Sequence, residues 1–253
     1  MPTTDPSLDP WALADTDPEF ADYFGHFAFG EVVADAARLD GRVTENVRVL
    51  VQAAACLVAG GQTGFRTLVA AGLSGGVVTP VEVKEVVYQA VAYAGAARAI
   101  DYLRALNEIL TDHRVPLPLP GQSASTPHTR LEHGKEVQAR IVGGIDAVQA
   151  RIDDAGADEK HLQRYLAANC FGDTVGRHGL EMNLRELVTF AMLVALGGAD
   201  AQVQGHVAAN LAVGNGRATL LAVLTLLVPF IGYPRALNGL AALNNITTSP
   251  SGA

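Results

Sequence analysis

Residues 45–61 read ENVRVLVQAAACLVAGG, and residues 182–198 read MNLRELVTFAMLVALGG. The two stretches align without a gap at a shift of 137 positions, which places Gly60 on Gly197. Both carry apolar residues at three- and four-residue spacing and end in a glycine pair, so each predicts a helix that stops at the same point. This pairing of distant segments decides how the rest of the chain is interpreted.

Two further blocks repeat in the same order. GAARAIDYLRALNEI (95–109) aligns with GYPRALNGLAALNNI (232–246) at the same shift of 137. Between the larger blocks, LVAAGL (68–73) lies opposite HVAANL (206–211) at a shift of 138, as a one-residue gap in a loop would produce. Three blocks in one order at nearly one spacing predict a duplicated domain.

Each repeat is predicted to be helical. TPVEVKEVVYQAVAYAG carries a full helix start signal, with Thr79 as the N-cap, Pro80 at the first position and Glu82 at the third, and Gly95 follows the last turn. No alternating run of β-branched residues suggests a strand, so the predicted fold class is all-α. The helical periodicity covers residues 46–59, 81–93, 96–110, 184–196, 202–213 and 218–228.

The predicted organisation is a first repeat at 1–111, a Pro-rich linker at 112–134 and a second repeat at 135–253, which opens with a helical pattern at 135–152. The apolar helices contain many small residues and have more surface to bury than one repeat can cover. We therefore expect the repeats to pack as a pseudo-symmetric pair and the chain to form a homo-oligomer, either a trimer or a dimer of two-domain chains.

Composition excludes several classes of partner. The chain has 253 residues, is 49% hydrophobic and carries a formal net charge of −8, which disfavours nucleic acid and anionic membranes as partners. The N-terminus has no signal-peptide pattern, and the charge-free stretch between Arg217 and Arg235 is interrupted by Pro229 and Gly232. We expect a cytoplasmic protein in which Cys56 and Cys170 are small core residues.

The chain resembles the carboxymuconolactone decarboxylase family, in particular its tandem-domain members. Four segments carry the resemblance, which covers about residues 17 to 247: DPEFADYFGHFAFGEV, TPVEVKEVVYQAVAYAG, NCFGDTVGRHGLEMNLRELVTFAMLVALGG and PFIGYPRALNGLAALN. It implies two alkylhydroperoxidase D-like helical domains that assemble into ring-like oligomers. It also implies one of two chemistries, cofactor-independent lactone decarboxylation or thiol-dependent peroxide reduction.

The peroxidase pattern that the resemblance implies is a Glu, a Cys-x-x-Cys pair and a His four residues after the second Cys. Counting back from His206, the thiol positions fall on Gln202 and Ala199, while Glu186 lies close to the expected Glu position. Leu68 replaces the His in the first repeat. A peroxide-reducing cycle needs a thiolate, so the missing thiols disfavour an alkylhydroperoxidase-like antioxidant function.

The remaining candidates suit acid–base chemistry. Gln202, His206 and Asn210 are spaced by four and share one helix face, and the turn after residue 196 would bring Glu186 alongside His206. We predict His206 as the general acid/base and Glu186 as the residue that orients it. The alternative is a buried His that a Glu satisfies for packing alone.

Substrate binding would fall to four residues. Arg185 and Arg235 could bind a carboxylate or a polarised carbonyl, and Gln202 and Asn210 could supply neutral hydrogen bonds. Arg185 and Arg235 have repeat counterparts, Arg48 and Arg98, which favours an architectural interpretation of both. The histidines at 113, 128 and 133 lack metal-ligand spacing, no Gly-rich phosphate loop follows a strand, and we predict neither a metal nor a cofactor.

The predicted function is a carbon–carbon lyase or an isomerase or cyclase of the carboxymuconolactone decarboxylase type. It would act without a cofactor on a small conjugated acid, lactone or polyketide-like ring. The Ala- and Gly-rich composition suggests a bacterial protein of secondary metabolism. Two alternatives stay open: a non-catalytic ligand-binding or structural oligomer, and the disfavoured antioxidant protein.

Overall fold

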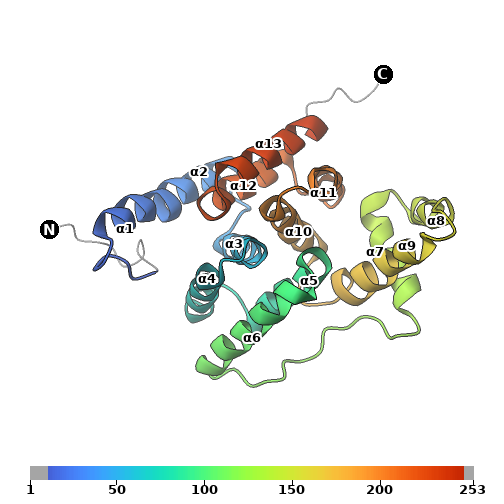
Figure 1. Cartoon of the computed structure of the whole chain (residues 1–253), viewed down its shortest axis with the longest axis horizontal. Coiled ribbons are helices and arrows are strands. Elements are labelled where there is room, and N and C mark those ends of the chain that lie inside the picture. The colour runs from blue at the N-terminus through green and yellow to red at the C-terminus, as the bar shows by residue number, and fades with distance from the viewer. Residues whose placement is uncertain (1–10, 248–253) are drawn as a thin grey trace.

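The computed structural model describes residues 11–247, which form helices and no strands (Figure 1). The predicted all-α class is therefore confirmed for this part of the chain. The elements are α1 (Pro18–Gly25), the π-helix η2 (His26–Glu31), α2 (Val32–Leu39), α3 (Glu45–Ala59), α4 (Gln62–Ser74), α5 (Pro80–Ala94), α6 (Ala96–Asp112), α7 (Arg130–Val142), α8 (Ile145–Asp153), α9 (Lys160–Tyr165), the π-helix η3 (Leu166–Val175), α10 (Met182–Leu196), α11 (Asp200–Ala212), α12 (Arg217–Ile231) and α13 (Tyr233–Thr247).

Helices α3 to α6 have counterparts in α10 to α13. Helix α10 begins at residue 182, 137 positions after α3 begins at residue 45, and both have 15 residues. Helices α5 and α12 also have 15 residues each and begin at 80 and 217, again 137 positions apart. The division into repeats at 1–111 and 135–253 stays a prediction.

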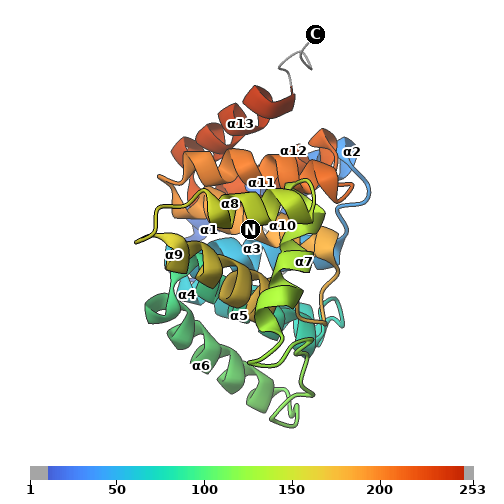
Figure 2. The same cartoon turned by 90° about the vertical axis from the view of Figure 1, so that its right-hand side faces the viewer.

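The two sets of helices share one hydrophobic core. Helices α3 and α10 pack against each other near the middle of the molecule, α12 packs on α3, and α5 packs on α10 (Figure 1). Helix α2 crosses to pack on α12, while η3 packs on α5. The side view shows α7, α8 and α9 on the face opposite α1 (Figure 2). Each set therefore helps to cover helices of the other set.

The predicted helix start at residue 79 is present in full. The Thr79 hydroxyl accepts a hydrogen bond from the Glu82 backbone N–H, and the Glu82 carboxylate accepts one from the Thr79 backbone N–H at 2.7 Å. These reciprocal bonds satisfy donors that a helix leaves unpaired at its N-terminus. Gly95 ends the helix with a φ of 79°, which only glycine adopts easily.

The predicted helical pattern at 135–152 is present as two helices. Gly143 and Gly144 adopt φ values of 96° and 108°, so the chain turns there and α7 and α8 are separate. Helix α7 also begins at Arg130, inside the segment that was predicted to be linker. Pro229 lies within the last turn of α12, and no helix among residues 11–247 has the length and apolarity needed to cross a bilayer.

Helices α7 and η3 meet through two glycines at backbone contact. A Cβ atom on Gly134 would lie 1.8 Å from the carbonyl oxygen of Ala167, and one on Gly172 would lie 2.1 Å from that of Arg130. Backbone atoms cannot rotate away as a flexible side chain can. Only glycine therefore allows α7 to hold η3 at this distance.

We predict that Gly134→Ala lowers the free energy of unfolding by about 2 kcal/mol or more, because the added methyl group forces α7 and η3 apart. Urea denaturation followed by circular dichroism measures this loss. Gly30→Ala is the matched control, since a Cβ on Gly30 meets no atom within 4 Å. Equal stability of the two variants would contradict the close approach of α7 and η3.

Candidate active site

Glu186 and His206 contact each other across the α10–α11 pair. Gly197 and Gly198, with φ values of 72° and 69°, make the tight turn that folds α11 back along α10. His206 Nδ1 lies 2.8 Å from Glu186 Oε2, so the contact expected from the sequence is present. The Glu186 side chain is fully buried, and its Oε1 atom has no hydrogen-bond partner among residues 11–247. A buried, half-satisfied carboxylate is costly and is a feature of functional sites.

Tyr93 contacts His206 from another element of the fold. The Tyr93 ring, at the end of α5, meets the imidazole edge to face with 5.9 Å between ring centroids. The Tyr93 hydroxyl is buried and has no hydrogen-bond partner of normal geometry in the described part of the chain. Burial raises the pKa of Tyr93 well above its usual value, and the nearby Cys170 and Glu186 add to the rise. Tyr93 is therefore a neutral phenol at any physiological pH.

His206 borders a cavity of about 780 Å³ that Tyr93 and Cys170 also line. Its walls come from α5, α7, α8, η3, α10 and α11, and most are apolar, including Ile141, Val142, Leu166, Phe171, Leu193 and Leu196. Arg151 is the only Asp, Glu, Lys or Arg among the lining residues, and it makes no ion pair with any described residue. A cavity of this size and polarity suits a small organic molecule.

The thiol in this cavity was not expected there. Cys170 lies on η3 and is partly buried, whereas Cys56 is buried in the core as predicted. Burial raises the pKa of the Cys170 thiol to about 11 and that of Cys56 to about 12. A thiol with such a pKa is almost entirely protonated at neutral pH and is a poor nucleophile.

Comparison with known families places this site in context. Residues 160–245 match the profile of the Carboxymuconolactone decarboxylase family. This segment is similar to that family. No protein of curated function matches the chain. The similarity is compatible with decarboxylase-like or alkylhydroperoxidase D-like activity, and the matched segment contains both Glu186 and His206.

Two of the four predicted binding residues, Gln202 and Asn210, lie on α11 with His206. Gln202 lines the cavity beside His206, one helical turn before it. Asn210 is fully buried below the cavity, where its amide donates to the backbone oxygens of Glu186 and His206 and accepts from Asn215. Asn210 therefore ties α11 to α10 and does not face a ligand.

The two arginines lie away from the cavity. Arg185 is 1% exposed and donates to Glu85, to Gln89 and to two backbone oxygens. Arg235 lies against Gly197 at the α10–α11 turn and lines only a narrow crevice there. Both placements favour the architectural interpretation over substrate binding.

Sequence reasoning missed Tyr93, Cys170 and Arg151. Tyr93 and Arg151 lie outside the matched family segment and reach the cavity from α5 and α8. Nothing in the local sequence marks either residue as part of a cavity. Helical periodicity shows that a residue lies on a helix, but it does not show which distant helix packs against that residue. Cys170 was predicted to be a small core residue, because its place in the sequence says nothing about the packing of η3 on α5.

The other set of helices has no matching acid–base pair. Leu68 occupies the place of His206 and lines a cavity of about 700 Å³ with Phe29, Arg48 and Thr67 among its walls. No three His, Cys, Asp or Glu side chains within residues 11–247 group as metal ligands would. The Glu186–His206 pair is therefore the candidate site for chemistry.

We predict that alkylation of Cys170 by iodoacetamide at pH 8 is roughly a hundredfold slower in the native protein than in the urea-unfolded chain, because little thiolate is present at that pH. The rate should keep rising with pH toward the pKa of about 11. Peptide mass spectrometry follows the site, and Cys170→Ser confirms the assignment. A native rate that levels off near pH 8.5 would contradict the burial of this thiol.

Proposed function

We propose that the chain is a cofactor-independent lyase or isomerase of the carboxymuconolactone decarboxylase type, acting on a small conjugated acid, lactone or polyketide-like ring. The observation that carries the proposal is the Glu186–His206 pair on the wall of a mostly apolar cavity of about 780 Å³. A hydrogen-bonded imidazole beside such a cavity is suited to move protons to and from a bound molecule.

The hydrogen bond assigns different tasks to the two imidazole nitrogens. A carboxylate accepts hydrogen bonds, so Nδ1 carries the proton that points to Glu186 Oε2. Among the described residues, Nε2 has no hydrogen-bond partner and is free for the substrate. Neutral His206 then acts as a base through Nε2, and the imidazolium that forms is stabilised by Glu186, as in other carboxylate–histidine pairs.

In a decarboxylation, protonated His206 would act as the acid. The bond between the substrate carbon and its carboxylate breaks, carbon dioxide leaves, and the electron pair enters the conjugated carbonyl system to give an enolate. The Nε2–H of His206 then protonates the carbon, and the neutral imidazole regains a proton from solvent. For an isomerisation, His206 would remove one proton and return it at another carbon.

The charges at the cavity favour a substrate with one acidic group. Arg151 stands at the exposed rim and could bind a carboxylate, while the apolar walls would surround the ring. Under this proposal Arg151 would take the role that the sequence suggested for Arg185 and Arg235. Gln202, on the same wall as His206, could donate a hydrogen bond to a carbonyl oxygen.

We predict that His206→Asn lowers kcat by about a hundredfold to ten-thousandfold, the range for loss of a general acid–base group. Glu186→Gln keeps the shape but removes the charge that stabilises the imidazolium, and should also lower kcat. Turnover is measured on a panel of unsaturated lactone acids and conjugated keto acids by carbon dioxide release, ultraviolet absorbance and solvent deuterium uptake.

His128→Asn is the matched control, because His128 is exposed in the linker and has no part in the site. Full turnover by His206→Asn would refute the proposed mechanism. Loss of turnover with an unchanged fold and oligomer would exclude the purely structural interpretation of the Glu186–His206 pair.

We predict that Arg151→Gln raises KM about tenfold or more for a carboxylate substrate, since a charge-assisted hydrogen bond contributes about 1.5–3 kcal/mol. The effect on kcat should be smaller, because the interaction is present before and during the reaction. Arg140→Gln on the exposed side of α7 is the control. Equal KM values for the two variants would remove Arg151 from substrate binding.

A further inference from the structure

A second cavity, of about 400 Å³, lies beneath the Pro-rich linker. Its floor comes from α5 and α6, through Val81, Lys84, Tyr88 and Asn107, and residues 117–122 cover it. Arg177, in the loop after η3, closes one side. No residue that lines this cavity also lines the His206 cavity, although both lie along α5.

Lys84 brings an unpaired charge to this cavity. The side chain belongs to a residue that is only 7% exposed, and its ammonium donates to the neutral amide oxygen of Asn107. No carboxylate forms an ion pair with it among the described residues. Burial lowers the pKa of Lys84 from its usual value, which is the response of an ammonium group without a counter-ion.

The single carboxylate in the cavity wall is already neutralised twice. Glu85 accepts from Arg177 Nε and Nη2 at 2.9–3.1 Å and from Arg185 Nη2 at 3.0 Å. Arg177 stacks over the Tyr88 ring at 5.1 Å, and its Nη1 atom donates to no described residue. With Lys84, three cations therefore lie around the one carboxylate of Glu85. No described carboxylate pairs with the Lys84 ammonium or with Nη1 of Arg177.

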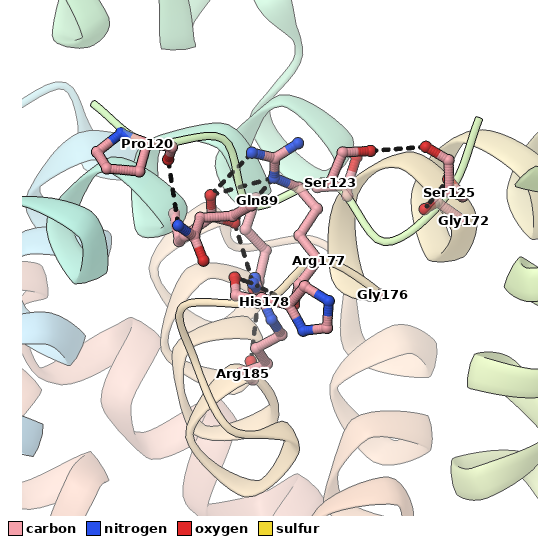
Figure 3. Close-up of polar contacts among 12 residues, drawn as sticks. Gln89, Pro120, Ser123, Ser125, Gly172, Gly176, Arg177, His178 and Arg185 are labelled. Atoms are coloured by element: carbon pink, nitrogen blue, oxygen red, sulfur yellow. Dashed lines mark hydrogen bonds and ion pairs between the residues drawn. The ribbon is translucent and has the colours of Figure 1, made fainter. Parts of the chain in front are cut away.

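The linker is fastened over this site. The backbone N–H of His178 donates to the Gln122 oxygen at 2.9 Å, and the Ser125 hydroxyl donates to the Gly172 oxygen at 3.1 Å. Figure 3 shows the Ser125–Gly172 contact, and it shows Arg177 and His178 close to Arg185. These two hydrogen bonds hold the linker in place over the cavity, where Leu117, Pro118 and Leu119 line it. A preformed site loses little entropy when it binds a ligand.

We propose that this cavity binds a small organic carboxylate, with the carboxylate held by Lys84 and Arg177 and an apolar body held under the linker. An anion there restores the charge balance that Glu85 alone does not supply. The apolar part of the wall, from Val81, Tyr88 and the linker prolines, suits a short hydrocarbon or aromatic body better than a bare inorganic ion. This site is independent of the chemistry proposed at His206.

The test is isothermal titration of the full chain with benzoate, acetate and inorganic phosphate. We expect benzoate to bind most tightly, Lys84→Met to weaken it at least tenfold, and Lys84→Arg to weaken it less. Lys160→Met is the matched control, because Lys160 is exposed on α9. Arg151→Gln and His206→Asn should leave this affinity unchanged, which separates the site from the proposed active site.

A second readout does not depend on a variant that folds. Acetic anhydride should acetylate Lys84 in the native wild-type chain, and benzoate should slow this reaction several-fold while Lys160 is unaffected, as peptide mass spectrometry would show. Three results would overturn the proposal: equal benzoate affinity of wild type and Lys84→Met, tighter binding of phosphate than of benzoate, or no benzoate binding or protection at about 10 mM, where a carboxylate held by two cations should bind.

Discussion

The buried ion pair between Arg185 and Glu85 is the interaction on which the candidate site depends. Both side chains are 1% exposed, and Nη2 of Arg185 lies 3.0 Å from Oε2 of Glu85. Arg185 also donates through Nη1 to Gln89 and through Nη2 to the backbone oxygens of Arg177 and His178 (Figure 3). Loss of Glu85 would leave the buried Arg185 without a counter-ion, which costs about 3–5 kcal/mol. The pair therefore fixes how α5 lies on α10.

The positions of both cavities follow from this contact. Glu186 is the next residue after Arg185, so the clamp on α10 that Arg185 provides also sets where Glu186 meets His206. Tyr93 lies two turns after Glu85 on α5 and reaches the His206 cavity, while Lys84 and Tyr88 on the same helix line the cavity beneath the linker. One helix thus carries walls of two sites, and its placement is set by a charge pair between segments 100 residues apart.

Local and periodic features were predictable from the sequence, and long-range pairings were not. The capping box at Thr79 and the contact of Glu186 with His206 follow from spacing and from a tight turn between adjacent helices. The partner of Arg185 does not, because a charged residue in an apolar run is compatible with a ligand or with a distant carboxylate. Only the packing of α5 on α10 distinguishes the two, and it assigns Arg185 to Glu85.

The half of the molecule that carries Leu68 still contributes to the surroundings of His206. Leu68 cannot exchange a proton, so the cavity beside it has no acid–base group in the place of His206. Yet α5 of that half supplies Tyr93, whose ring packs against the imidazole, and Gln89 and Glu85, which anchor α10. Loss of α5 would remove part of the cavity wall and the counter-ion of Arg185. The half without an acid–base pair is therefore needed to keep the surroundings of His206 in place.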